Sequence, residues 1–251
     1  MSRDDLTDFL HSWPHEPGPI NARRIVGGDG RAKLQIRIDL GVLQMEMEGR
    51  PDGQRFDGFD SLLSYQQDRL RRYGEQTANV SDFALNPEEC RALREEAVQY
   101  YHRYVGLFAL GDYDAAIRDT TRSLQIFDLC RDFAANEADR TALEPFRPHA
   151  IMMRARGEAE QALSGGQSKQ AMAAIDRGLG QIKAAFEESG AGDAYEQSSE
   201  AQLLRGMQDA LVPKLPASQR IELQQRLGAA LDAENYELAA ILRDELRMME
   251  G

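Results

Sequence analysis

Residues 221–250 contain two short rows of mainly apolar side chains, each spaced as on one face of an amphipathic helix. The first row consists of Leu223, Leu227, Ala230 and Leu231. The second row consists of Tyr236, Ala239, Ala240, Arg243 and Leu246. The two stretches meet at Glu234–Asn235, and the small Ala239 and Ala240 would let two antiparallel helices approach closely. The sequence therefore predicts a C-terminal helical hairpin.

A hairpin of this length buries little apolar surface by itself. Segments shorter than about 40 residues usually need disulfides, metal ions or association to remain folded. We therefore expect the hairpin to pack against the rest of the chain, against a second copy or against a partner protein.

The same stretch resembles the UVR motif, the C-terminal helical hairpin of the excision-repair proteins UvrB and UvrC. The matching positions are Leu223, Leu227, Ala230, Glu234, Tyr236, Glu237, Ala239, Ala240, Arg243, Asp244, Glu245 and Leu246. Tyr236 stands where the motif usually has Phe. In that family the hairpin pairs with another such hairpin and catalyses nothing. The resemblance therefore implies a partner-binding surface that includes Leu223, Leu227, Ala230, Tyr236, Ala239, Ala240, Arg243, Asp244 and Leu246.

The N-terminal part of the chain predicts β-structure. Leu34, Ile36, Ile38 and Leu40 alternate with polar residues, and the phase reverses after Gly41. A bulge or bend at Gly41–Val42 would keep both apolar rows on one face. Strand is expected only within about residues 22–50. The stretch from Asp39 to Gly53 also resembles the opening of uncharacterised bacterial proteins that end in a UVR motif.

The middle of the chain predicts helices. Asn86–Pro87 followed by two glutamates is a strong helix start, and Gly165–Gly166 is expected to join a later helix pair. The segment Gly111–Asp112–Tyr113 and the residues after it resemble the turn and second helix of a tetratricopeptide repeat. The spacing between turns is longer than in that family, so two unrelated antiparallel helix pairs remain an alternative.

The expected fold is mainly α. Antiparallel, tetratricopeptide-like helical hairpins follow a small β-hairpin module and precede the UVR hairpin. Four segments are expected: a mobile arm, the β-hairpin with one helix, the helical region and the UVR hairpin, at residues 1–20, 21–80, 81–212 and 217–251. Trp13–Pro14 and Pro17–Gly18–Pro19 should block regular structure in the arm.

Charge argues against direct nucleic-acid binding, because the net charge is -12. The first eighty residues nevertheless carry arginines at Arg23, Arg24, Arg31, Arg37, Arg50, Arg69, Arg71 and Arg72. They could contact an anion or a nucleic acid, or they could pair with the acids among them. The second interpretation is favoured, because the local charge nearly cancels.

No residue pattern points to catalysis, a metal ion or a cofactor. The four histidines lack metal-ligand spacing, and Gly27–Gly–Asp–Gly30 lacks the Lys-Ser/Thr ending of a phosphate loop. Cys90 and Cys130 are expected to be buried free thiols. No signal peptide or membrane span is expected, which favours a cytoplasmic location.

The favoured function is a non-enzymatic adaptor that binds another protein or a second copy through the hairpin, with a possible link to nucleotide excision repair. Two alternatives remain open: a repair accessory factor that contacts DNA, and a regulator of a chaperone or protein kinase. The last rests on the UVR-like hairpin in the activator of bacterial protein-arginine kinase, which resembles this chain only in the hairpin.

Overall fold

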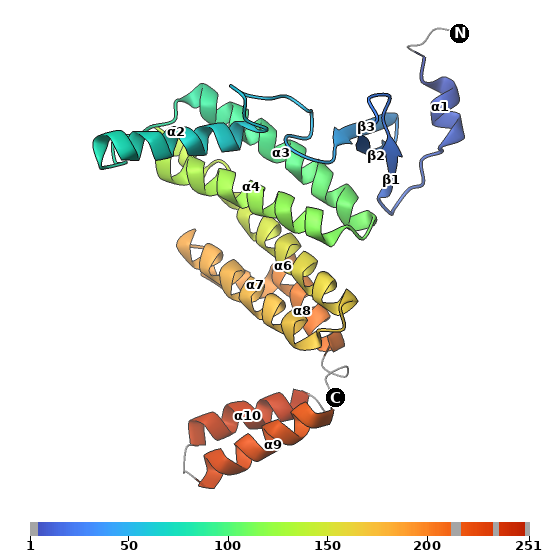
Figure 1. Cartoon of the computed structure of the whole chain (residues 1–251). Helices are drawn as coiled ribbons and strands as arrows, with labels where there is room; N and C mark the ends of the chain where they lie inside the picture. Colours follow the sequence, from blue (N-terminus) through green and yellow to red (C-terminus); the bar gives the residue numbers. More distant parts are fainter. Residues whose placement is uncertain (1–4, 212–216, 233–235, 249–251) are drawn as a thin grey trace. The chain divides into compact units, whose positions relative to one another are not determined.

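The computed structural model describes residues 5–211, 217–232 and 236–248 (Figure 1). The chain separates into two compact units, Met1–Gly157 and Glu158–Gly251. The expected fold class is confirmed: 67% of the chain is helical, a three-stranded antiparallel sheet lies in the N-terminal unit, and a helical hairpin ends the chain.

The sheet consists of β1 (Asn21–Val26), β2 (Ala32–Ile38) and β3 (Gly41–Glu46), in the order β1-β2-β3. The bulge or bend predicted at Gly41–Val42 is wrong in its position, although both apolar rows do lie on one face. The chain instead reverses in a two-residue turn at Asp39–Leu40, where Ile38 pairs with Gly41. Side chains of a hairpin change phase at the turn, which explains the reversal in the sequence. The Arg37 guanidinium donates to the carbonyls of Ile38, Asp39 and Gly41 and so fixes this turn.

The prediction that residues 1–20 form an arm without regular structure is wrong for residues 7–12. Residues Thr7–Ser12 form helix α1, and Trp13 anchors the segment to the sheet. The Trp13 indole Nε1 donates to Asn21 Oδ1 at 2.9 Å, and the Arg37 Nε donates to the Trp13 carbonyl at 2.7 Å. The Arg23 guanidinium lies 3.9 Å from the centre of the Trp13 ring. The prolines restrict the backbone locally, but these contacts hold the arm in one place.

Helices α3 (Pro87–Ala109) and α4 (Tyr113–Phe133) form the antiparallel centre of the N-terminal unit (Figure 1). The predicted start of α3 is confirmed, since Asn86 and Glu89 form a reciprocal capping box. Gly106 lies where the sheet meets α3: a Cβ there would come within 2.8 Å of Ile36 and 2.9 Å of Leu34. The absence of a side chain at Gly106 therefore lets the sheet pack closely on α3.

A buried polar network ties the segment between β3 and α2 (Leu62–Thr77) to this helix pair. Arg103 forms an ion pair with Asp119 at 2.6 Å, and both side chains have no exposed surface. Arg103 also donates to the carbonyls of Glu46 and Gly49, each at 2.9 Å. At the start of α2, the buried Glu96 carboxylate accepts from the backbone of Leu62 and Leu63. We call residues 46–63 the strap.

The remaining helices lie between α4 and the C-terminal hairpin in the sequence. They are α5 (Glu137–Thr141), η1 (Glu144–Phe146), α6 (Arg147–Ser164), α7 (Ser168–Glu188), η2 (Gly192–Gln197) and α8 (Ser199–Leu211). The join at Gly165–Gly166 is confirmed, and α7 packs against α8 and η2. The similarity of the helix pairs to tetratricopeptide repeats stays a prediction.

Candidate functional site

The C-terminal hairpin consists of α9 (Ala217–Asp232) and α10 (Tyr236–Met248), which pack against each other. Its seam is formed by Ala230, Ala239 and Leu242, which are 4%, 5% and 2% exposed. Leu223 and Leu227 pack against this cluster from α9. Small residues on both helices therefore let the backbones approach, and three leucines fill the remaining space.

Most of the predicted partner-binding residues belong to this seam, although whether they bind a partner stays a prediction. Leu223, Leu227, Ala230 and Ala239 lie in it or against it, Leu246 is buried, and Ala240 is half-buried. The side chain of Tyr236 lies outside the described residues.

Two positions in the predicted apolar rows are wrong. Arg243 is 70% exposed along its side chain, and Leu231 is 50% exposed. The seam of α10 instead runs through Ala239, Leu242 and Leu246, a spacing of three and four residues. Leu242 was missed because the row was started at Tyr236 and continued through the charged Arg243, although the aliphatic spacing 239, 242, 246 was present in the sequence.

The helical spacing of α10 predicts that Arg243 reaches across the hairpin to an acid such as Glu222 or to a helix-end carbonyl, while Asp244 faces a partner. Instead, the Arg243 Nε lies 3.9 Å from the neighbouring Asp244 carboxylate, and both side chains are about two-thirds exposed. The side chain of Glu222 lies outside the described residues. A long, solvated ion pair of this kind contributes little to stability. It therefore leaves both charged groups accessible at the surface of α10.

The hairpin also exposes aliphatic side chains away from its seam. On α10, Leu238 is 38% exposed and Ile241 is 54% exposed. On α9, Leu231 is 50% exposed. Ile241 and Leu242 are neighbours in the sequence, but Leu242 is buried in the seam and Ile241 faces the solvent. Substitutions at these two positions can therefore test the packing of the hairpin and its outer surface separately.

Six of the eight arginines noted in the first eighty residues are paired with acids, as the charge balance suggested. Arg24 contacts Asp112 at 2.5 Å, and Arg50 contacts Asp52 at 3.0 Å. The other ion pairs are Arg31–Asp29, Arg69–Glu89, Arg71–Asp68 and Arg72–Asp68. Arg23 and Arg37 instead contact Trp13 and backbone or amide groups. This pairing removes the main support for a direct nucleic-acid contact.

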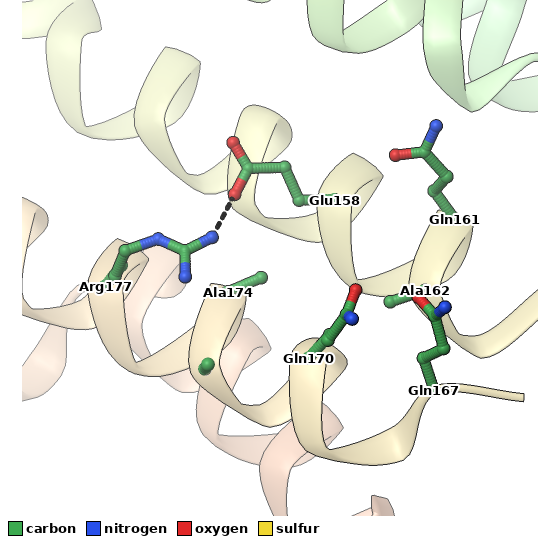
Figure 2. Close-up of a pocket in the computed structure, with 8 residues that line it drawn as sticks. Glu158, Gln161, Ala162, Gln167, Gln170, Ala174 and Arg177 are labelled. Carbon is green, nitrogen blue, oxygen red and sulfur yellow. Dashed lines mark hydrogen bonds and ion pairs between the residues drawn. The ribbon is translucent and has the colours of Figure 1, made fainter. Parts of the chain in front are cut away.

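A hollow of about 400 Å³ lies between α6 and α7 (Figure 2). Across it, Arg177 donates to Glu158 at 2.8 Å. The rest of its lining is made of amide and methyl side chains, at Gln161, Ala162, Gln167, Gln170, Ala173 and Ala174. Among these lining residues there is no Ser, Cys or His that could act as a nucleophile beside a base.

A second hollow, of about 390 Å³, lies beside α2 in the N-terminal unit. It is lined by Arg69, Arg72, Tyr73, Gln76, Asp82, Phe83 and Ala84. Both guanidiniums already contact carboxylates, Glu89 and Asp68 respectively. The charges in and around this hollow therefore nearly cancel, and they favour neither an anion nor a cation.

In the described part of the chain, no three His, Cys, Asp or Glu side chains come together as a metal site would require. No helix among the described residues combines the length and apolar character needed to span a membrane.

Comparison with known proteins identifies only the hairpin. Residues 218–251 match the family model of the UvrB/uvrC motif, which confirms the resemblance seen in the residues. Searches of curated proteins and of solved structures found no match to the chain.

Proposed function

We propose that the protein is a non-enzymatic adaptor that binds another protein through the outer surface of the α9–α10 hairpin. The match of residues 218–251 to the UvrB/uvrC motif carries this proposal, since that motif is typically a protein-interaction hairpin. The proposed partner is a protein that bears a second hairpin of this type, or a second copy of this chain. A partner protein with a second hairpin of this type would link the protein to excision repair. The proposed location of the protein is the cytoplasm.

The packing of the hairpin supports the use of its outer surface. Ala230, Ala239 and Leu242 are already buried against each other, so the seam has no room for a partner side chain. Ile241 and Leu231 keep about half of their surface in water. Covering aliphatic surface on binding contributes roughly 25 cal/mol per Å² before the cost of association. The exposed aliphatic residues, together with the accessible Arg243 and Asp244, therefore form the proposed contact.

The neighbours Ile241 and Leu242 provide the test. Ile241→Asp in the full chain is expected to leave the helical content unchanged, because position 241 already faces water. It should weaken partner binding about tenfold or more, since it would bury an unpaired charge where the partner covers this surface. Leu242→Asp should unfold the hairpin, because it places an unpaired charge in the seam. Circular dichroism measures the helical content of both variants, and light scattering with affinity capture measures partner binding.

The matched control is Gln225→Asp, which adds the same charge at an exposed position of α9. It should change neither folding nor binding. Mass spectrometry of the captured proteins is expected to identify one with a UvrB/uvrC motif, unless light scattering shows self-association. If the captured protein is instead a chaperone or a kinase, the regulator becomes the better assignment. Binding that is equal in the Ile241→Asp variant and the unmodified chain would rule out the hairpin surface.

A further inference from the structure

The outer edge of β1 carries backbone groups that no neighbouring strand uses. Gly27 donates its N–H to the Arg31 carbonyl at 2.8 Å, which fixes the alternation of hydrogen bonds along the β1–β2 ladder. The residues that bond β2 are therefore Asn21, Arg23 and Ile25. The N–H and C=O groups of the alternate residues, Ala22, Arg24 and Val26, point away from β2.

The opposite edge of the same sheet is closed at one end by the chain itself. On β3, the outward N–H of Glu46 donates to the Pro51 carbonyl at 2.8 Å. The Glu46 carbonyl accepts from Arg103 Nη1 at 2.9 Å. Along the described residues, β1 has no comparable cover, and its continuous register contains neither a bulge nor a proline. Exposed edges without such protection are templates for the addition of a strand.

Among the described residues, the hydrogen bonds between the arm and the sheet involve the side chains of Asn21 and Arg37 and not the backbone groups of Ala22, Arg24 or Val26. Trp13 stacks on Arg23, whose side chain projects from the face of the sheet opposite to that of Arg24. The arm therefore contacts one face, and α3 packs against the other.

The side chains beside the edge favour an acidic strand. β1 contains Arg23 and Arg24 and no acid. The side chain of Arg24 is 52% exposed, and its Nη2 contacts Asp112. Val26, two residues further on the same face, is 75% exposed. Opposite charges on directly paired positions stabilise a sheet, and an aliphatic residue opposite Val26 would cover its exposed surface.

The same charges disfavour a second copy of this chain as the added strand. In a symmetric antiparallel pair of two β1 strands, the registers centred on Arg23 or on Arg24 would place two arginines opposite each other. Like charges at directly paired positions destabilise the pairing. We propose that the outer edge of β1 binds an extended acidic segment of a partner protein as a fourth strand. The segment carries Asp or Glu opposite Arg24 and an aliphatic residue two positions away.

Binding of the peptide Ser-Val-Thr-Glu-Thr-Val-Ser, labelled for fluorescence anisotropy, tests this proposal on the full chain. The sequence of this peptide reads the same in both directions, so its Glu can lie opposite Arg24, with a Val two positions away, in a parallel or an antiparallel strand. We expect it to bind and to slow hydrogen exchange at the amides of Ala22, Arg24 and Val26. The same peptide with Lys in place of Glu should bind at least about tenfold more weakly, because it sets a cation beside Arg24.

Ala22→Pro removes an outward N–H without breaking a bond to β2, as edge prolines do. It should weaken binding about tenfold, the effect of one lost backbone hydrogen bond with added local restriction. Gln44→Pro is the matched control, since it removes an outward N–H from the β3 edge of the same sheet. It should leave the affinity unchanged. Arg24→Gln should reduce the preference for the Glu peptide over the Lys peptide.

Equal affinities for the two peptides, or equal weakening by Ala22→Pro and Gln44→Pro, would overturn the proposal. Self-association that is lost in Ala22→Pro would also overturn it, because the edge would then belong to a second copy. The hairpin variant Ile241→Asp should bind the peptide normally, so the outcome is independent of the adaptor function.

Discussion

Replacing Arg103 with methionine is expected to lower the free energy of unfolding of the N-terminal unit by about 3–5 kcal/mol. The substitution leaves the fully buried Asp119 without its cation. It also removes the donors to the carbonyls of Glu46 and Gly49 in the strap. Urea denaturation followed by the fluorescence of Trp13, the one tryptophan of the chain, measures the loss.

Arg71→Ala is the matched control for this prediction. Arg71 is 57% exposed and pairs with Asp68 and Glu75 on the surface of α2. Its removal should cost no more than about 1 kcal/mol, as is usual for exposed pairs. Combining Arg103→Met with Asp119→Leu should recover part of the stability, because no unpaired charge then remains buried. Equal losses for Arg103→Met and Arg71→Ala would contradict the importance of the buried pair.

Cys90 and Cys130 are expected to resist thiol reagents in the folded protein. Both are fully buried free thiols, on α3 and α4, and their sulfurs contact each other. Burial raises the pKa of both thiols, so the reactive thiolate is scarce. Labelling should be at least about a thousandfold slower than in urea, because it requires opening of the helix pair. Rapid labelling of either thiol in the native state would contradict this.

The same burial predicts a loss of stability at alkaline pH. Burial raises the pKa of Cys130 to about 12, whereas an unfolded thiol ionises near its ordinary value. Above about pH 9 the unfolded chain therefore loses a proton that the native state keeps, and stability falls by up to about 1.4 kcal/mol per pH unit. In the variant Cys130→Ala this part of the slope should disappear. Urea midpoints measured between pH 8 and 11 would show the difference, and parallel curves would refute it.

The regular parts of the fold could be predicted from local sequence signals. The start of α3 at Asn86–Pro87, the turn at Gly165–Gly166 and the C-terminal hairpin each depend on a few neighbouring residues with strong backbone preferences. The apolar spacing of α10 is also a local signal, but the predicted row contains the exposed Arg243 where the structure has the buried Leu242. On α9 the predicted row also includes Leu231, which is exposed.

The contacts that the sequence did not reveal join residues far apart along the chain. Nothing near Trp13 indicates that its indole will bond Asn21 and its carbonyl Arg37. Arg103 and Glu96 look like ordinary polar residues of an exposed helix surface. They are buried because the strap crosses α3 and supplies partners for them. Such partners become visible only when the three-dimensional path of the strap is known.

The strap makes the sheet depend on parts of the chain that are synthesised later. The groups that hold Glu46 and Gly49 belong to α3, and the carboxylate that completes the ion pair belongs to α4. Closing these long loops is costly until the local contacts of the α3–α4 pair have formed. We therefore expect the helix pair to form first and the strap to close over it afterwards. During synthesis, the ion pair that holds Arg103 against the strap can be completed only after Asp119 of α4 has left the ribosome.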